Sequence, residues 1–171
     1  MNHGILLINK EKNITSFQAV KRIKRILKIK KIGHSGTLDP LATGLLCIGI
    51  GQGTKTFPYI SAFTKTYIAE GKLGLYSDTY DITGKITEGK EKKIALEEIQ
   101  SILTNFLGKI EQKPPIYSAL KIKGKPAYHY ARNGIAINLE TRTIHIHSIK
   151  LLKFEYPNFI IEIVCSGGTY V

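Results

Sequence analysis

The sequence predicts an α+β fold in which a mixed, mainly antiparallel β-sheet is flanked by helices. Apolar runs of strand length and stretches with helical periodicity follow one another without strict βαβ alternation, which disfavours a doubly wound parallel sheet. Two alternating runs flank Pro157-Asn158, a pattern typical of a β-hairpin. With 171 residues, 43% of them hydrophobic, the chain can form one domain with a sizeable core.

The first fifty residues predict a strand, a helix, a loop and a second strand. The helix begins near Thr15 and Gln18, whose spacing is that of a capping box. Apolar residues then recur at helical period, so we expect Val20, Ile23, Ile26 and Leu27 to face the core. The other three segments are a strand at 4–9, a glycine-rich loop at 31–40 and a strand at 45–50.

The remainder of the chain predicts five further strands and three helices. An amphipathic helix at 95–106 should be terminated by Gly108, and a short helix at 54–60 should be perturbed by Pro58. The inward residues of the longer helix should be Leu96, Ile99, Ile102, Leu103 and Phe106. The other expected elements are strands at 66–73, 117–122, 144–155 and 159–164, a turn entering a strand at 81–87, and a helix at 127–132.

The charge balance favours a polyanionic partner. Lys and Arg number 25 and Asp and Glu 13, which gives a net charge of +12. Such an excess is typical of proteins that bind nucleic acid or an anionic membrane surface, although a coding bias towards lysine is the alternative. The cations of the first helix are compatible with RNA contact or with an ordinary solvated face; they are Lys21, Arg22, Lys24, Arg25 and Lys28.

Several classes of protein are disfavoured. No segment has the roughly 20 apolar residues that cross a bilayer, and the first residues lack a signal-peptide pattern, so we expect a cytoplasmic protein. Cys47 and Cys165 lie in separate apolar runs and are expected to be buried thiols rather than a disulfide or metal pair. His145 and His147 share a strand face but lack a third ligand, so no metal site is expected.

One segment, residues 33–44, has the composition of a rigid loop that presents a carboxylate. Asp39 lies among glycines and is followed at once by Pro40, which holds the preceding residue extended. An aspartate in water is ionised at neutral pH, so Asp39 could act as a base or a nucleophile. The alternative is a structural turn in which Asp39 accepts hydrogen bonds from backbone N–H groups.

Extended to Leu46, this segment reads GHSGTLDPLATGLL, which closely resembles GHTGTLDPLATGVL, the catalytic motif of the TruB family of pseudouridine synthases. Only Ser35 and Leu45 differ. Further blocks resemble this family in order along essentially the whole chain. They are GILLINK at 4–10 with ITS at 14–16, KTY at 65–67, DTYDITG at 78–84, QKPPIYSALK at 112–121, YARNG at 130–134 and CSGGTYV at 165–171.

The resemblance implies the pseudouridine synthase fold and isomerisation of uridine to pseudouridine at position 55, in the T-loop of tRNA. It makes Asp39 the residue essential for breaking the N-glycosidic bond, either by covalent addition or by removal of a ribose proton. Tyr67 corresponds to a tyrosine that stacks on the target base and is implicated in C5 deprotonation. His34 corresponds to a histidine that helps to displace the target nucleotide. The resemblance implies no cofactor and no metal.

The expected partner is the T-arm of tRNA, bound by a monomer. Besides His34, the residues expected to contact RNA are Lys10, Lys21, Arg22, Arg25, Lys31, Lys121 and Arg132. For Lys10 and Lys121, a solvated surface position without RNA contact is the alternative.

Three departures from the family pattern affect these expectations. Gly167 stands where the family usually has lysine, and Glu11 replaces a common proline. The printed sequence also stops before an arginine that pairs with the catalytic aspartate in the family, and before the C-terminal PUA domain. We therefore expect residues 1–171 to be a partial catalytic domain, with the sheet incomplete at its C-terminus and with little or no activity.

Two other functions compete with this interpretation. A non-catalytic basic RNA-binding module would also explain the cationic helix. A nucleotide-binding protein would use GIGQGTKT at 49–56, but Thr54 separates Gly53 from Lys55, so the order of a phosphate-binding loop is not met.

Overall fold

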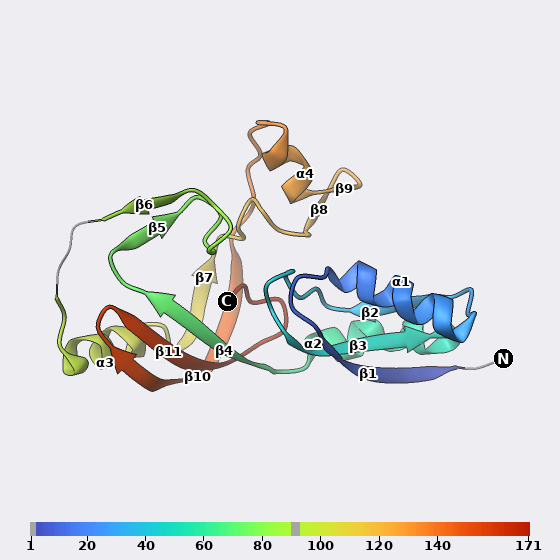
Figure 1. Ribbon diagram of the computed structural model, residues 1–171, viewed down its shortest axis with the longest axis horizontal. Coiled ribbons are helices and arrows are strands. Elements are labelled where there is room, and N and C mark those ends of the chain that lie inside the picture. Colours follow the sequence, from blue (N-terminus) through green and yellow to red (C-terminus); the bar gives the residue numbers. More distant parts are fainter. Residues whose placement is uncertain (1–2, 90–92) are drawn as a thin grey trace. The chain divides into compact units, whose positions relative to one another are not determined.

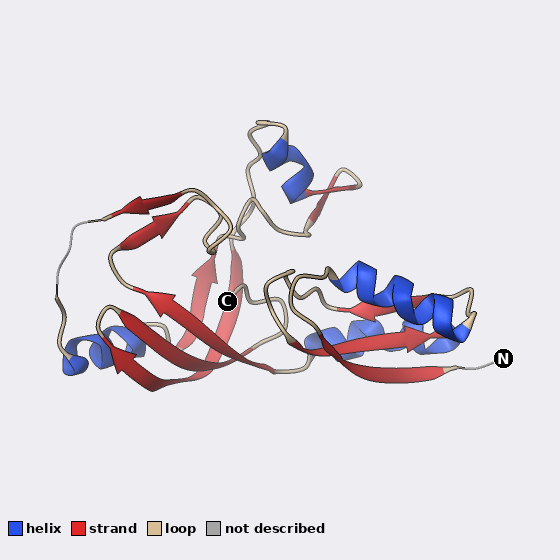
Figure 2. Cartoon of the chain, viewed as in Figure 1, coloured by secondary structure: helices blue, strands red, loops and turns tan. Residues whose placement is uncertain are grey.

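The structure is a computed structural model that describes residues 3–89 and 93–171, and it divides into two compact units (Figure 1). The N-terminal unit is Met1–Phe63 and the C-terminal unit is Thr64–Val171. Strands and helices are mixed in both units, and all strand pairs are antiparallel, which confirms the α+β class (Figure 2). No helix in the described ranges is long and apolar enough to cross a membrane.

The N-terminal unit is built on a three-stranded sheet in the order β1-β3-β2. Its strands are β1 (Gly4–Lys10), β2 (Ile32–Ser35) and β3 (Gly44–Ile50), and its helices are α1 (Ser16–Leu27), the 3-10 helix η1 (Gly51–Thr56) and α2 (Phe57–Ala62). Ala19 and Val20 of α1 form a buried cluster with Leu46 and Ile48 of β3. The ring of Phe57 lies against Gly49, where a Cβ would be only 2.6 Å from a ring carbon.

Helix α1 begins as predicted. The Thr15 hydroxyl accepts from the N–H of Gln18 (3.1 Å), and the Gln18 side chain accepts from the N–H of Thr15 (2.7 Å), which completes the capping box. The predicted inward stripe is only partly right. Val20 is buried and Ile23 packs on the cluster, but Ile26 is 74% exposed and Leu27 is 44% exposed. Burial is therefore confined to the first two turns of the helix.

Two other predictions for this unit need correction. Residues 32–35 are a strand rather than part of a loop, because Ile32 pairs with Ile50 and Ser35 with Cys47 in the β2–β3 ladder. Long-range pairing here overrides the low strand propensity of glycine. Pro58 lies in the first turn of α2, where its missing N–H costs nothing, so it starts the helix instead of perturbing it.

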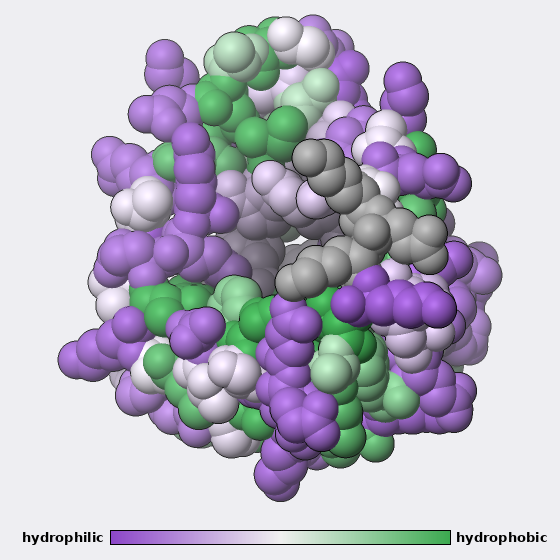
Figure 3. Space-filling model, turned by 90° about the vertical axis from the view of Figure 1, so that its left-hand side faces the viewer, coloured by the Kyte–Doolittle hydropathy of each residue, from purple (hydrophilic) through white to green (hydrophobic). Residues whose placement is uncertain are grey.

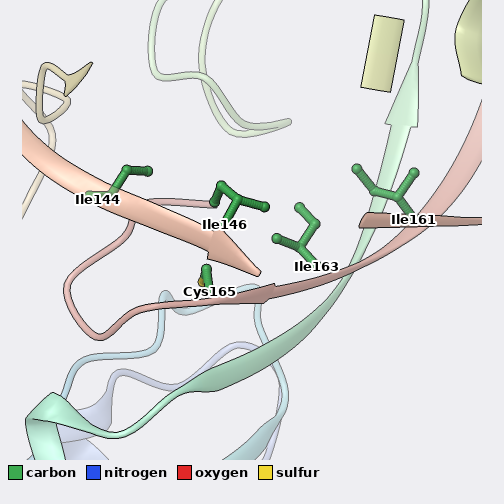
Figure 4. Packing of buried hydrophobic residues seen from close by; sticks show 5 residues of the cluster. All are labelled: Ile144, Ile146, Ile161, Ile163 and Cys165. Atoms are coloured by element: carbon green, nitrogen blue, oxygen red, sulfur yellow. The ribbon is translucent and has the colours of Figure 1, made fainter. Parts of the chain in front are cut away.

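The C-terminal unit contains a four-stranded sheet in the order β4-β11-β10-β7. Its strands are β4 (Lys65–Lys72), β7 (Gly108–Gln112), β10 (Arg142–Glu155) and β11 (Asn158–Cys165). Helix α3 (Leu96–Thr104) accompanies them, with two small hairpins, β5 (Leu75–Ser77) with β6 (Ile86–Glu88) and β8 (Lys121–Ile122) with β9 (Lys125–Pro126), and with α4 (Ala127–Arg132). The buried core consists of side chains from β10 and β11, shown in Figure 4: Ile144, Ile146, Ile161, Ile163 and Cys165.

The hairpin of β10 and β11, strand β4 and helix α4 confirm their predictions, but two expectations for this unit are wrong. The strand expected at 117–122 is limited to Lys121–Ile122. Gly108 begins β7 instead of ending α3, which stops at Thr104 with Asn105 as its cap. Strands β5, β7 and β9 were not predicted.

Helix α3 buries less than its periodicity suggests. Ile99 is buried and Leu103 packs on the core, whereas three other expected inward residues are exposed, namely Leu96, Ile102 and Phe106. Figure 3 views the molecule from the side of Figure 1 on which α3 and the β5–β6 hairpin lie, and it shows apolar patches between hydrophilic side chains.

The two cysteines are free thiols, as predicted. Cys165 is buried and Cys47 is partly buried.

Candidate active site

The loop between β2 and β3 presents Asp39 at the surface of the N-terminal unit. Asp39 is exposed, and its carbonyl accepts a hydrogen bond from the N–H of Ala42 at 3.1 Å. Glycines with positive φ lie at both ends of the loop, Gly36 at +86° and Gly44 at +118°, conformations that residues with a Cβ rarely adopt. The carboxylate is therefore not sealed within the core, as a catalytic role requires.

A buried serine fixes the residue before Asp39. The Ser16 hydroxyl donates to the carbonyl of Leu38 (3.0 Å) and accepts from the N–H of Leu38 (2.9 Å). A hydroxyl can do both at once because it carries one proton and two lone pairs. Ser16 is only 1% exposed, so both bonds are shielded from water. Helix α1 thereby holds the backbone immediately ahead of Asp39.

Asn13, which follows β1, and Lys10, which ends it, fix the residue that follows Asp39. The N–H of Asn13 donates to the carbonyl of Pro40 at 2.7 Å. The ammonium of Lys10 donates to the carbonyls of Ile14 (2.8 Å) and Glu11 (2.9 Å), and lies 3.5 Å from that of Pro40. Asp39 thus lies between two neighbours that are both held by α1, β1 and the segment between them.

Lys10 is a structural cation beneath the loop, and this corrects its predicted place on the surface. Its side chain is 1% exposed and its ammonium donates to backbone carbonyls, so it is not available to RNA. Burial lowers the pKa of Lys10, and the negative charge of Asp39 acts in the opposite direction by favouring the ammonium form.

Tyr67, the other residue expected to take part in the chemistry, belongs to the C-terminal unit. It lies on β4, where it pairs with Ile163 of β11. Its side chain is partly buried and packs against the buried core cluster of this unit. The tyrosine is therefore positioned by a sheet ladder and by apolar packing, whereas Asp39 is positioned by hydrogen bonds to the residues beside it.

His34 lies on β2, opposite Ile48 of β3, and is partly buried. Its Nδ1 is 2.5 Å from the carbonyl oxygen of Gly36. Because a carbonyl can only accept, Nδ1 carries the proton in this contact, and Nε2 is the acceptor when the ring is neutral. The next residue, Ser35, has its hydroxyl 3.2 Å from that of Ser61 on α2. The histidine is thus tied to the glycine that starts the Asp39 loop.

The expected RNA-contacting cations other than Lys10 are all exposed, in two groups within the chain. Lys21, Arg22 and Arg25 lie on α1, and Lys31 follows that helix. Arg22 forms an ion pair with Glu11 at 3.2 Å, and Lys21 lies over the ring of Phe17 at 4.8 Å. Lys121 is on β8 and Arg132 on α4, where its guanidinium lies 5.3 Å from the centre of the Tyr128 ring. Their contact with RNA stays a prediction.

Sequence reasoning missed several residues that hold the motif-bearing segments in place. Ser16 is the main example, because nothing local marks its bonds to a residue 22 positions away. In the C-terminal unit, the Gln112 amide bonds both the N–H (2.9 Å) and the carbonyl (2.8 Å) of Tyr170. Arg142 donates to the carbonyl of Gly168 and stacks on the Tyr170 ring at 4.6 Å. Both Ser16 and Gln112 follow the same principle, with one side chain satisfying two backbone groups.

No metal-binding cluster is found among residues 3–89 and 93–171, since nowhere do three or more His, Cys, Asp or Glu side chains gather suitably. The rings of His145 and His147 stack on each other with their centres 4.4 Å apart.

Comparison with known proteins gives consistent matches. The family model described as TruB family pseudouridylate synthase (N terminal domain) matches residues 24–171. The tRNA pseudouridine synthase B of Clostridium tetani is 46% identical over 170 residues, which are 99% of this chain and 59% of that protein. The enzyme of the same name from Ureaplasma urealyticum is 45% identical over 174 residues, covering 100% of this chain and 76% of that protein.

The fold also matches solved structures. A chain of a Cbf5-Nop10-Gar1 complex superimposes with a TM-score of 0.71 at 24% identity, covering 98% of this chain and 41% of that one. At this identity the match concerns the fold alone. The present chain spans about 59% of the length of the Clostridium tetani protein.

Proposed function

Because this chain belongs to the TruB family of pseudouridylate synthases, we propose that its protein isomerises uridine to pseudouridine at position 55, in the T-loop of tRNA. The proposal is supported by relatives named tRNA pseudouridine synthase B at 45–46% identity, which match the chain over 99–100% of its length. It is supported equally by the residues themselves, since the segment GHSGTLDPLATGLL is present without a gap. We expect the enzyme to act as a monomer in the cytoplasm.

The observation that carries the proposal is the position of Asp39. A carboxylate that must reach the ribose of a bound nucleotide has to be accessible, and it has to be held still. Asp39 is exposed, while Leu38 and Pro40 on either side of it accept hydrogen bonds from buried or structured partners. Positioning of this kind matters because small displacements of a catalytic group cost large factors in rate, about 100-fold for 1 Å.

The proposed reaction is a rearrangement. The bond between N1 of uracil and C1′ of ribose breaks with help from Asp39, which either adds to the sugar or removes a ribose proton. The detached base rotates, a bond forms between C5 and C1′, and C5 then loses its proton while N1 gains one. Atoms and electrons balance without an oxidant or reductant. The residues near Asp39 need only hold the carboxylate in place and leave room for the sugar.

Tyr67 and His34 would serve the base rather than the sugar. A uridine must leave the folded loop before a side chain can reach its glycosidic bond, which costs a few kcal/mol. Stacking on an aromatic ring returns about 1–3 kcal/mol, and Tyr67 offers the ring. In this proposal the Tyr67 hydroxyl also assists proton removal from C5. His34 helps to displace the nucleotide from the T-loop and is kept beside the Asp39 loop by its contact with Gly36.

The test is the release of tritium from tRNA labelled at C5 of uridine, with protein expressed from its natural reading frame. Asp39→Asn should lower turnover by at least about 10³-fold, as removal of an essential catalytic group does. Binding of tRNA should change little, because the variant keeps the size and hydrogen-bonding shape of the side chain. Replacing U55 of the tRNA by cytidine should abolish release by the unchanged enzyme.

Glu140→Gln is the matched control, since Glu140 is exposed and also loses one negative charge. Full turnover by Asp39→Asn would refute the catalytic assignment. Tight tRNA binding by the unchanged protein, with no release of tritium at all, would favour the alternative of a non-catalytic RNA-binding module.

A further inference from the structure

The excess positive charge is concentrated in the N-terminal unit. Residues 1–63 contain ten Lys and Arg and two acids, Glu11 and Asp39, a net charge of +8. Residues 64–171 hold the other 15 cations and 11 acids, a net charge of +4. Two thirds of the net charge therefore lies in little more than a third of the chain. The cations themselves are spread almost evenly, 10 in 63 residues against 15 in 108, so the asymmetry comes from the scarcity of acids in the N-terminal unit.

Four of these cations form what we call the α1 stripe: Lys21, Lys24, Arg25 and Lys28. Lys21, Lys24 and Arg25 occupy positions i, i+3 and i+4 and so share one side of the helix, and Lys28 follows as its left-handed C-cap, so that the four span about 10 Å along the axis. All four are exposed. The opposite side of α1, with Ala19 and Val20, is buried against β3.

The α1 stripe carries unbalanced charge. Within the part of the chain that the structure describes, the cations of the stripe make no ion pair with an acidic side chain, whereas Arg22 beside them is paired with Glu11. Like charges at i,i+3 and i,i+4 oppose helix formation. The helix dipole favours cations in the last turn, which accounts for Lys24 and Arg25 but not for Lys21 in the middle of the helix.

One stripe residue is also held in place. The ammonium of Lys21 lies 4.8 Å from the centre of the Phe17 ring, which is itself 60% exposed. A cation–π contact of this kind restricts a long flexible side chain, so less entropy is lost when the ammonium binds an anion. The stripe therefore combines uncompensated charge with partial preorganisation.

We infer that the α1 stripe docks the sugar–phosphate backbone of RNA and supplies affinity without taking part in the chemistry. The inference rests on the proposed function, because it takes the tRNA substrate as the polyanion. A row of cations about 10 Å long matches the regular negative charge of a nucleic acid, which has a phosphate every few ångströms. Such contacts hold any sequence, so the choice of uridine is left to the residues around Asp39.

A membrane surface fits the same helix less well. Amphipathic helices that lie on bilayers insert their apolar side while basic residues flank it. In α1, Val20 and Ile23 already pack on the buried cluster, and the exposed apolar residues that remain on the helix, Phe17, Ile26 and Leu27, are fewer than the cations beside them. RNA is therefore the partner that the geometry favours, and membrane binding becomes an outcome of the test.

The experiment replaces all four stripe residues by glutamine, which removes the charge and keeps a similar helix propensity. Affinity for tRNA is measured by filter binding over a range of salt concentrations. We expect the dissociation constant of the Lys21→Gln, Lys24→Gln, Arg25→Gln, Lys28→Gln variant to rise by about tenfold or more at low salt. The slope of log affinity against log salt should become shallower by about 3. At saturating tRNA, kcat should stay unchanged while KM rises.

The matched control removes four positive charges from the C-terminal unit by Lys72→Gln, Lys109→Gln, Lys150→Gln and Lys153→Gln. Lys150 and Lys153 already face Glu162 and Glu155 at 3.4 Å and 3.2 Å, so their loss should change the slope much less. Circular dichroism and thermal unfolding establish that both variants fold.

Each remaining outcome separates the two claims. Unchanged affinity and slope in the stripe variant would overturn the docking surface and leave the Asp39 proposal standing. A reduced slope in a protein without any turnover would uphold the docking surface and refute the reaction. Loss of binding to phosphatidylserine vesicles, with tRNA affinity intact, would assign the stripe to a membrane instead of RNA.

Discussion

The two residues proposed to act on the uridine are held by different kinds of structure. Asp39 lies in an irregular loop, and its neighbours are fixed by the side chain of Ser16 and by groups from residues 10–13. Tyr67 lies in β4, whose backbone is paired with β11 over residues 65–72. The position of Asp39 thus depends on a few side chains, whereas that of Tyr67 depends on many backbone bonds that no single substitution removes.

The first way to sharpen this comparison is to change Tyr67 itself. Tyr67→Phe keeps the ring that packs on the core, so the fold should survive while the hydroxyl is lost. If that hydroxyl assists deprotonation of C5, kcat should fall by about 10²–10⁴-fold in the tritium-release assay. Tyr67→Leu removes the stacking ring as well as the hydroxyl, so it should raise KM in addition to lowering kcat.

Full turnover by the Tyr67→Phe enzyme would show that Tyr67 stacks on the base and takes no part in deprotonation of C5. Tyr128→Phe, which removes an exposed phenol from α4, is the matched control and should leave the rate of the C5 step unchanged.

The second prediction tests whether side chains alone hold the Asp39 loop. Ser16→Ala removes one atom that bonds both backbone groups of Leu38, and leaves those groups buried without that partner. The free energy of unfolding should fall by about 1–3 kcal/mol. Because Leu38 precedes Asp39, kcat should fall by about 10- to 100-fold with little change in KM.

Ser61→Ala is the control for Ser16→Ala, since it removes the same hydroxyl from α2, where the hydrogen bond to Ser35 is exposed to solvent. It should cost less than about 0.5 kcal/mol. Equal losses of kcat in the two variants, or a Ser16→Ala enzyme as active as the parent, would show that the loop keeps its geometry without the serine.

The local parts of this architecture were readable from the sequence. The Thr15 and Gln18 capping box spans four residues, and the β10–β11 hairpin joins neighbours in the chain, so their patterns are contained in short windows. Strand β2 was missed because its pairing partner, β3, lies across the Asp39 loop and its own composition is rich in loop formers. Local propensity cannot report a ladder that depends on another segment.

The site divides in the same way. Resemblance to family motifs identified Asp39, Tyr67 and His34 as candidate site residues. The glycines and the proline around Asp39 predicted that the loop would present its carboxylate. The support beneath the loop was not predictable. Ser16 bonds a residue 22 positions away. Lysine is rarely buried in proteins, so residue type alone would have placed Lys10 on the surface and not beside the carbonyl of Pro40.

The smallest predicted effect concerns a third carboxylate, Asp81 in the turn between β5 and β6, which contrasts with Asp39. Asp81 is surrounded by donors, and one of its oxygens accepts from the Thr79 hydroxyl (2.7 Å) and from the N–H (2.9 Å) and hydroxyl (2.5 Å) of Thr83. Burial raises the pKa of Asp81, but the hydrogen bonds from Thr83 and Thr79 outweigh it and hold the pKa below its ordinary value.

A depressed native pKa means that the unfolded state binds the proton more readily. The ionised carboxylate therefore stabilises the fold at pH values above about 3.9, and this contribution is lost as the pH falls through the native pKa. Asp81→Asn should lower the free energy of unfolding by about 1 kcal/mol near neutral pH, measured by urea denaturation. The difference from the parent should shrink as the pH is lowered below about 4. If the free energy of unfolding of Asp81→Asn stayed below that of the parent by the same amount at acid pH, the charge of Asp81 would not be the source of the stabilisation. The threonines would then stabilise only the shape of the turn.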